Sequence, residues 1–260
     1  LVEGANLYAV ASRDISRAKE FANEFGAEKY YANYHELVKD PGVDVVYIAS
    51  PHPFHFEQSL LCLNNGKHVL CEKPICMNAQ EVEKLVDVAQ SKKLFLMEAL
   101  WTRFIPSFMK CKEMVEKGEI GEVLGIHADF GFKAEYNVQM RTFNKELGGG
   151  SLLDIGIYPV FFALEIAGKP DKIVATGVFG ETGVDESCSI VFKYPDKKIL
   201  ANLSSTFLVD TPTEAIVYGT EGYIKLHGKW HTPTKLSHIK NGKEEVFTFD
   251  EPGFGYQYEI

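Results

Sequence analysis

The sequence of 260 residues is short of cysteine and of positive charge, and each shortage excludes a class of protein. The five cysteines are odd in number, lie in apolar segments and include no C-x-x-C pair. We therefore expect reduced thiols in a reducing compartment, the cytoplasm, and no metal site. The formal net charge of −9 argues against a general binder of nucleic acid or of acidic membranes. No apolar run approaches the ~20 residues that a membrane helix needs.

Two further absences concern the ends of the chain. The sequence does not begin with Met, and it contains no G-x-G-x-x-G loop of the kind that binds dinucleotides. We therefore expect a fragment that lacks an N-terminal strand with its Gly-rich loop, and that is also shortened at its C-terminus. The status of a signal peptide stays open for the same reason.

The first hundred residues alternate between strand and helix patterns. Apolar runs predict strands at residues 6–12, 43–50, 68–72 and 94–100, and helical periodicity predicts helices at residues 14–26, 55–66 and 78–93. This alternation is typical of a parallel sheet with helices on its faces. The sequence predicts an α/β, Rossmann-type doubly wound domain over residues 1–103, which would bind a dinucleotide.

The pattern changes after about residue 121. A long strand at residues 122–132 and a Gly-led helix at residues 148–168 precede several strands that have no helices between them. Turn pairs such as Pro195-Asp196 and Asn241-Gly242 separate these strands. We predict an α+β domain with an open, mostly antiparallel sheet over residues 104–260, which serves the substrate and dimerisation. Because a wide apolar sheet face is a liability in water, we expect a homodimer through this sheet.

Two predicted strands of the first domain end in unusual polar sequences. "SPHPFH" (residues 50–55) follows one strand, and "CEKP" (residues 71–74) closes the next. In an open α/β sheet, ligands bind beyond the carboxyl ends of the strands. Pro74 ends its strand and favours an extended backbone at Lys73, so we expect Lys73 to be presented to a ligand. The alternative is a surface turn with a solvated lysine.

A second group of polar residues follows the glycine run at residues 148–150. Asp154 and Tyr158 are four residues apart, which places them on one helix face, and the glycines would let a ligand approach the backbone. An ammonium group near a phenol lowers the phenol pKa from its usual ~10, so Tyr158 beside Lys73 would act as a general base. The alternative is that Tyr158 packs between domains and Asp154 makes a structural hydrogen bond.

Longer motifs resemble a known family. "GKHVLCEKP", "FLMEALWTRFIP" and "GGSLLDIGIY" are similar to the glucose-fructose oxidoreductase / inositol dehydrogenase (Gfo/Idh/MocA) family over nearly the whole chain. Within it they resemble the branch of dimeric dihydrodiol dehydrogenases and NADP-dependent D-xylose dehydrogenases. The resemblance implies catalytic roles for Lys73 and Tyr158, supported by Asp154. It also implies aromatic substrate contacts at Trp101 and Trp230, and it leaves open whether Phe130 or Phe132 joins them.

Residues at the end of the first predicted strand indicate independently which cofactor would bind. NAD enzymes place an acidic residue on the ribose after the second strand, whereas here Ser12 and Arg13 stand at the strand end and Arg17 follows one helical turn later. Two guanidinium groups suit a 2′-phosphate, so we predict NADP rather than NAD. The alternative is an ordinary exposed helix start. The expected cofactor contacts are Ser12, Arg13, Arg17, Ser50, His52, His55, Glu72 and Lys73.

Three functions remain from these observations. The first is an NADP-dependent oxidoreductase that moves a hydride from a vicinal diol or sugar hydroxyl, of trans-dihydrodiol or D-xylose type, to the nicotinamide. The second is another sugar or polyol dehydrogenase of this family, and the third is a non-catalytic ligand sensor on the same fold. The presence of Lys73 and Tyr158 favours catalysis. Arg141, near the glycine run, is a further candidate for contact with substrate, and Ser151 has no histidine at a spacing that indicates a serine hydrolase.

Overall fold

The computed structural model describes residues 2–232, 234–249 and 255–260, and the chain divides into two compact units. The N-terminal unit comprises Leu1–Leu100 with Ile260, and the C-terminal unit comprises Trp101–Glu259.

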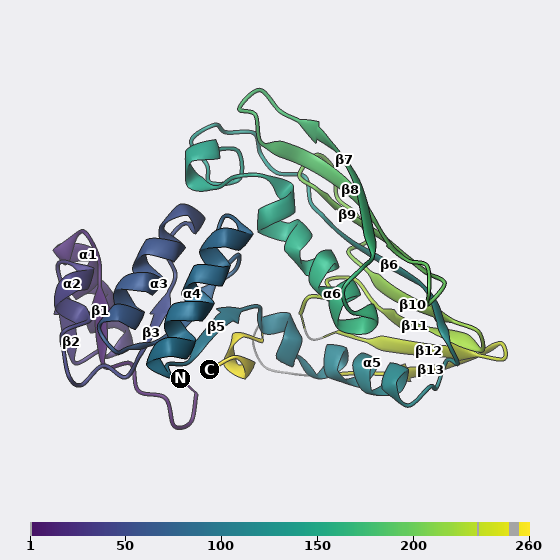
Figure 1. Cartoon of the computed structure of the whole chain (residues 1–260), viewed down its shortest axis with the longest axis horizontal. Coiled ribbons are helices and arrows are strands. Elements are labelled where there is room, and N and C mark those ends of the chain that lie inside the picture. Colours follow the sequence, from purple (N-terminus) through teal and green to yellow (C-terminus); the bar gives the residue numbers. More distant parts are fainter. Residues whose placement is uncertain (1, 233, 250–254) are drawn as a thin grey trace. The chain divides into compact units, whose positions relative to one another are not determined.

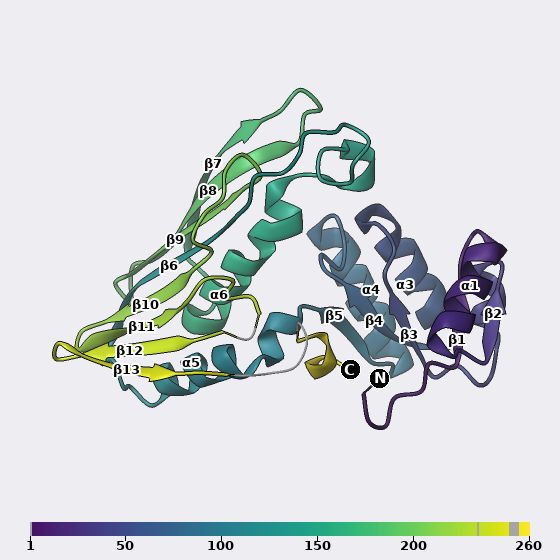
Figure 2. The same cartoon turned by 180° about the vertical axis from the view of Figure 1, so that it is seen from behind.

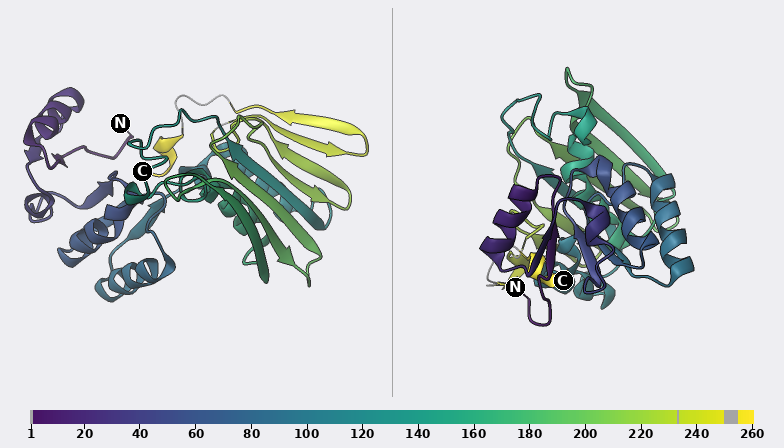
Figure 3. Two further views of the ribbon diagram at one scale, coloured as in Figure 1. Left: turned by 90° about the horizontal axis from the view of Figure 1, so that it is seen from above. Right: turned by 90° about the vertical axis from the view of Figure 1, so that its left-hand side faces the viewer.

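The N-terminal unit alternates strands and helices, as predicted (Figure 1). Its strands form two parallel sheets rather than one: β1 (Ala9–Ala11) pairs with β2 (Lys29–Tyr31), and β3 (Val45–Ile48), β4 (His68–Glu72) and β5 (Leu96–Ala99) pair in that order. Its helices are α1 (Ile15–Phe25), α2 (Tyr34–Leu37), α3 (His55–Asn64) and α4 (Ala79–Lys92). Helices α3 and α4 lie side by side, as the right-hand view of Figure 3 shows. The sequence patterns missed β2 and α2. A strand of three residues and a helix of four are too short to show a hydrophobic period.

Local sequence signals explain where these helices begin and end. The side chain of Asp14 accepts a hydrogen bond from the Ser16 amide at 2.9 Å, and Gly26 ends α1 with φ +77°. Asn78 caps α4 in the same way, since its side chain accepts from the Glu81 amide at 3.0 Å. Both helices therefore lie within the ranges that the sequence predicted, residues 14–26 and 78–93.

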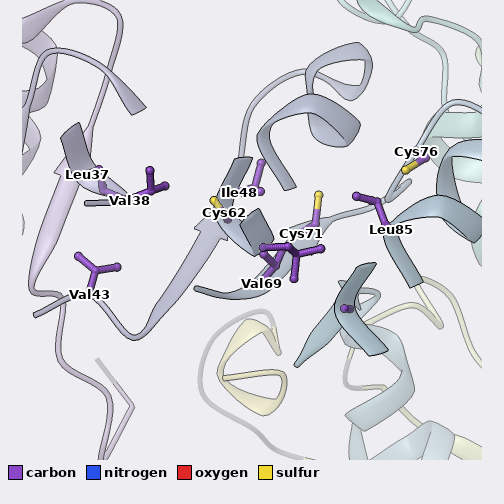
Figure 4. Packing of buried hydrophobic residues seen from close by; sticks show 11 residues of the cluster. Leu37, Val38, Val43, Ile48, Cys62, Val69, Cys71, Cys76 and Leu85 are labelled. Carbon is purple, nitrogen blue, oxygen red and sulfur yellow. The ribbon is translucent and has the colours of Figure 1, made fainter. Parts of the chain in front are cut away.

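Apolar side chains between the sheet and the helices form the core of this unit (Figure 4). Val69 and Cys71 of β4, Leu63 of α3 and Leu85 of α4 have no exposed surface. Fully burying an aliphatic side chain contributes roughly 1.5–3 kcal/mol, so this core holds the strand ends rigidly. All five cysteines of the chain are free and buried, in agreement with the predicted reduced thiols.

The C-terminal unit is built on one sheet of eight strands, in the order β13-β12-β11-β10-β6-β9-β8-β7. Neighbouring strands are antiparallel except for β6 and β9, which confirms the predicted open, mostly antiparallel sheet. The strands are β6 (Val123–Gly131), β7 (Lys172–Phe179), β8 (Asp185–Tyr194), β9 (Ile199–Thr206), β10 (Ala215–Gly219), β11 (Gly222–Leu226), β12 (Leu236–Lys240) and β13 (Lys243–Phe247).

The helices of this unit lie on one face of the sheet (Figures 1 and 2). Helix α6 (Ile157–Ala167) contacts β6 and β9, and α5 (Pro106–Glu116), which the sequence patterns missed, contacts β11. In the part of the chain that the structure describes, no helix covers the other face. Side chains therefore alternate along the strands: Ala201 and Leu203 of β9 are buried on the helix side, whereas Leu200 on the opposite face is 50% exposed.

The helical stretch Lys145–Ala167 is long and apolar. It is 23 residues long and apolar enough to cross a membrane by length and composition, so the prediction that no run approaches this length is wrong. Its most apolar window is 61% buried inside the protein, which is typical of a core helix. The stretch is therefore weak evidence for a membrane segment.

Candidate active site

Lys73 lies in a turn that three strand ends hold in place. Its amide donates to the Glu72 carboxylate at the end of β4 (3.2 Å), and the same carboxylate accepts the hydroxyl of Tyr47 from β3. The Ile75 amide, just past the turn, donates to Glu98 of β5 at 2.8 Å. The peptide bond between Lys73 and Pro74 is cis. The turn that carries Lys73 is thus an ordered part of the carboxyl edge of the β3-β4-β5 sheet.

The His55 ring bridges the segments that follow β3 and β4. Its Nδ1 lies 2.8 Å from the carbonyl oxygen of Pro74, and its Nε2 lies 2.6 Å from that of Ser50. The ring has no exposed surface, and backbone carbonyls face both nitrogens. The structure therefore gives His55 a supporting place rather than the direct cofactor contact that we predicted. His52 is also buried, with 4% exposure, and its ring meets His55 edge-on.

The other candidate cofactor residues are compatible with a bound dinucleotide. Arg13 and Arg17 are exposed at the start of α1, where Ser12 accepts the Asp14 amide at 3.2 Å. The Arg13 guanidinium carbon lies 5.5 Å from the ring centroid of Phe54. Among the described residues, the buried hydroxyl of Ser50 has no hydrogen-bond partner. An unsatisfied hydroxyl at a strand end and two exposed guanidinium groups fit a ligand that carries phosphate and hydroxyl groups.

Tyr158 belongs to a compact group of rings in the C-terminal unit. Its hydroxyl accepts the indole N–H of Trp101 at 3.0 Å, and only 5% of the residue is exposed. Phe130 stacks on His231 with centroids 4.2 Å apart, and each of these rings lies 5.4 Å from the Tyr158 ring. Tyr256 stacks on Trp101 at 4.5 Å. We call these five residues the aromatic cluster. A hydrogen bond donated to a phenol oxygen favours its charged form, which a general base needs.

The structure separates the predicted aromatic substrate contacts into those inside and those outside the aromatic cluster. Phe130 belongs to the aromatic cluster, whereas Phe132 packs on Phe207 at 5.4 Å. Trp230 has no exposed surface; its indole N–H donates to the carbonyl oxygen of Asp129 at 3.0 Å, and its ring packs on Phe162. The predicted substrate contact of Trp230 is therefore not what the structure shows, since a tryptophan in the core has no surface to offer a ligand.

Two members of the aromatic cluster escaped the sequence analysis. His231 directly follows Trp230, and that neighbour was its only signal in the sequence. Its carbonyl oxygen accepts the buried Thr102 hydroxyl at 2.9 Å, which fixes the backbone beside the ring. Tyr256 reaches Trp101 from a distant part of the chain, so no local pattern indicated it.

Asp154 and Arg141 form a pair. Both terminal nitrogens of Arg141 donate to the Asp154 carboxylate, at 2.8 and 3.3 Å. The Asp154 side chain is 8% exposed and that of Arg141 is 46% exposed. Arg141 therefore holds Asp154, and because almost half of its side chain is exposed, its contact with substrate stays a prediction. The prediction that Asp154 and Tyr158 share one face of an α-helix is also wrong. Asp154 lies in a π-helical turn (Leu152–Gly156), whereas Tyr158 lies in α6.

The glycine run serves close packing within the protein. A Cβ atom on Gly149 would lie 2.7 Å from the Arg141 carbonyl oxygen, and one on Gly150 would lie 2.4 Å from a carboxylate oxygen of Asp185. Gly150 also has φ +124°, which other residues rarely adopt. At these two glycines, protein atoms occupy the space that we had expected a ligand to use.

Comparison with known proteins gives matches over both units. Residues 2–100 match a family described as an oxidoreductase family with an NAD-binding Rossmann fold, and residues 108–225 match the GFO/IDH/MocA C-terminal domain. The chain is 43% identical over 241 residues to the trans-1,2-dihydrobenzene-1,2-diol dehydrogenase of Xenopus tropicalis, covering 92% of this chain and 72% of the relative. It is 40% identical over 262 residues to the Homo sapiens protein of the same name, covering 96% and 77%.

Solved structures agree with these matches. KijD10, a 3-ketoreductase from Actinomadura kijaniata in complex with NADP and TDP-benzene, has a TM-score of 0.85 and 27% identity, covering 97% of this chain and 78% of that one. An aldose-aldose oxidoreductase from Caulobacter crescentus shares the fold at a TM-score of 0.89 and 23% identity, covering 99% and 81%. These findings confirm the resemblance found in the motifs: the chain belongs to the GFO/IDH/MocA family and is an NAD(P)-binding oxidoreductase.

Proposed function

We propose that this enzyme is an NADP-dependent dehydrogenase that oxidises a vicinal diol or a sugar hydroxyl, of trans-dihydrodiol or D-xylose type. The observation that carries the proposal is the hydroxyl of Tyr158, which accepts the Trp101 indole N–H inside the aromatic cluster. The names of the relatives support a dihydrodiol substrate. Rings also suit such a substrate, because a flat or nearly flat carbon ring stacks on aromatic side chains.

In the proposed reaction, Tyr158, Lys73 and Asp154 have different roles. The Tyr158 oxygen takes the proton from the reacting hydroxyl, while the carbon that bears this hydroxyl gives up a hydride and becomes a carbonyl carbon. The nicotinamide, when bound, supplies the carbon that accepts the hydride. Lys73 contributes a positive charge that favours the charged form of Tyr158 in the same step. Asp154, held by Arg141, keeps the segment that precedes Tyr158 in place.

The residues that would hold the cofactor lie in the N-terminal unit. Arg13 and Arg17 would bind the 2′-phosphate that distinguishes NADP from NAD, because guanidinium groups form paired hydrogen bonds with phosphate. Ser50 would donate its unsatisfied hydroxyl to the bound cofactor. Lys73 and Glu72, at the end of β4, complete the proposed contacts.

The experiment compares Lys73→Met, Tyr158→Phe and the double variant. Lost acid–base assistance is worth roughly 10²–10⁴-fold in rate, so each single variant should lower kcat/KM by that factor. The double variant should lose little more than either single, because both residues act in one step. Lys92→Met and Tyr30→Phe, at exposed positions, are the matched controls.

The readouts are kcat/KM with trans-dihydrobenzenediol and with D-xylose, followed at the nicotinamide absorbance, and a separate titration of NADP binding. We expect NADP binding to persist in all variants. Retention of activity within a few-fold of the parent in Lys73→Met would show that the strand end is only a turn.

We also propose a homodimer through the uncovered sheet face. Val174, Leu200 and Tyr218 are 47%, 50% and 42% exposed. The strand registers place Leu200 and Tyr218 in one row across the sheet, on either side of Gly125. A monomer would leave these apolar side chains exposed to water, and exposed apolar side chains gathered on one sheet face are typical of an interface.

A further inference from the structure

We propose that Asp185 is a positioning residue for Tyr158. It holds the start of the helical segment that carries Asp154 and Tyr158, and so sets where the phenol lies. The inference rests on the proposed role of Tyr158, and it concerns a residue that takes no direct part in the proposed reaction.

The contacts of Asp185 lie at the entry to the helical segment. One carboxylate oxygen of Asp185, the first residue of β8, accepts the Ser151 hydroxyl at 2.8 Å and the Leu152 amide at 2.7 Å. Amides in the first turn of a helix have no partner within the helix, and a carboxylate is a strong acceptor for them. Asp185 therefore acts as a cap, although it is distant from the helix in sequence.

The backbone before the helix leaves room for this cap. The second carboxylate oxygen of Asp185 would lie 2.4 Å from a Cβ atom at position 150, so only glycine allows Asp185 to come this close. The φ of +124° at Gly150 also favours glycine. The chain can enter the helical segment along this path only because residue 150 has no side chain.

Ser205 of β9 lies close to both ends of the π-helical turn. The hydroxyls of Ser151 and Ser205 lie 3.0 Å apart, and both residues are buried. At the other end of the turn, a Cβ atom on Gly156 would lie 2.9 Å from the Ser205 hydroxyl. Asp185, Ser151 and Ser205 thus hold the start of Leu152–Gly156 by hydrogen bonds, and Ser205 packs closely against its end.

A π-helical turn depends on such external contacts because its backbone hydrogen bonds are less favourable than those of an α-helix. If Asp185 is lost, we expect the turn to relax toward α-helical geometry. That relaxation changes the rotation of the residues that follow it, and Tyr158 is the second residue after the turn. The hydrogen bond from Trp101 to Tyr158 would then weaken, and the base would be displaced.

The chain contains two tryptophans, which provide an internal reporter and an internal reference. The Trp101 indole N–H donates to Tyr158, whereas that of Trp230 donates to the backbone of β6 at Asp129. In a ¹H–¹⁵N spectrum of the full chain labelled with ¹⁵N-tryptophan, each indole gives one signal. Trp101→Phe assigns the two signals by the one that it removes.

The experiment compares Asp185→Ala and Asp185→Asn with the parent. Asp210→Ala is the matched control, because Asp210 also accepts a backbone amide, that of Lys133 at 3.0 Å, and this amide does not belong to the helical segment. We expect Asp185→Ala to move the Trp101 signal and leave the Trp230 signal in place. Asp185→Asn, which keeps one acceptor oxygen, should move it less, and Asp210→Ala should move neither.

Activity provides the second readout. Asp185→Ala should lower kcat by about tenfold or more with little change in the KM for NADP, and Asp185→Asn should recover part of the loss. An unmoved Trp101 signal in a folded Asp185→Ala variant would overturn the inference. If that variant does not fold, an unmoved signal in Asp185→Asn overturns it. A moved signal with unchanged activity would instead leave the positioning intact and contradict the role of Tyr158.

Discussion

Arg13 is the residue on which the proposed preference for NADP depends. It is exposed at the start of α1, with its guanidinium over the ring of Phe54 and with Arg17 one turn further along the helix. The ring limits the directions in which the side chain can point, so less conformational entropy is lost when a phosphate binds. Arg13 is therefore better placed for phosphate binding than a lysine free in solvent.

We expect Arg13→Asp to reverse the cofactor preference. A hydrogen bond to a charged group is worth about 1.5–3 kcal/mol, so kcat/KM with NADP should fall by roughly ten- to a hundredfold. Activity with NAD should fall much less, because NAD lacks the 2′-phosphate that the new carboxylate repels. The measurement is kcat/KM with each cofactor, and Lys19→Asp on the same helix is the control for charge. A parent enzyme that uses NAD as well as NADP would contradict this prediction.

At the scale of single elements, a buried carboxylate joins β2 to the segment after α2. Asp40 is 7% exposed and accepts the Lys29 ammonium at 2.8 Å, the Tyr31 hydroxyl at 2.5 Å and the Gly42 amide at 2.8 Å. These hydrogen bonds, above all that from Lys29, hold the pKa of Asp40 well below its usual value. Three donors, two in β2 and one in the segment after α2, thus depend on one charged acceptor.

We expect this carboxylate to stabilise the fold in a pH-dependent way. The pKa of Asp40 is lower in the folded chain than in the unfolded one, so its stabilisation is present above about pH 4 and is lost as the pH falls below that value. Asp40→Asn should therefore lower the free energy of unfolding at pH 7, and the difference from the parent should shrink in acid. Urea unfolding between pH 3 and pH 7 measures it, with exposed Asp87→Asn as the control. A difference that does not change with pH would contradict the prediction.

At the scale of the whole molecule, the eight-stranded sheet has helices on one side only. One row of side chains crosses five strands of the uncovered face and mixes polar with apolar residues: Ile216, His127, Asn202, Val191 and Val174. A mixed surface of this kind is typical of interfaces, which are not uniformly apolar. A second copy of the chain is the partner that a flat face can pair with symmetrically.

Light scattering should therefore give twice the chain mass of 29.1 kDa at micromolar concentration. Replacing Leu200 and Tyr218 by aspartate places charges in the middle of the proposed interface, and the double variant should be monomeric. Glu116→Lys, at the end of α5, is a control on the helix side of the sheet. A parent protein that is monomeric at these concentrations would contradict the homodimer.

The sequence by itself determined the order of the elements, most of their bounds and the family. Strand alternation, helix caps such as Asp14 and the turn at Lys73-Pro74 depend on residues that are close together in the chain, so their spacing predicts them. The same holds for Lys73, Tyr158 and Asp154, which stand in motifs that the resemblance recognises. The sequence patterns missed β2 and α2, which are too short to show a period, and they also missed the 11-residue α5.

Only the tertiary structure decided the surroundings of these residues. The hydrogen bond from Trp101 to Tyr158 joins residues 57 positions apart, and neither His231 nor Asp185 carries a local sign that it lies beside the helical segment or the aromatic cluster. Trp230 and Trp101 have the same side chain, yet one fills the core and the other binds the phenol. The physical reason is that burial and hydrogen-bond partners depend on how distant segments pack, which the spacing of neighbouring residues does not specify.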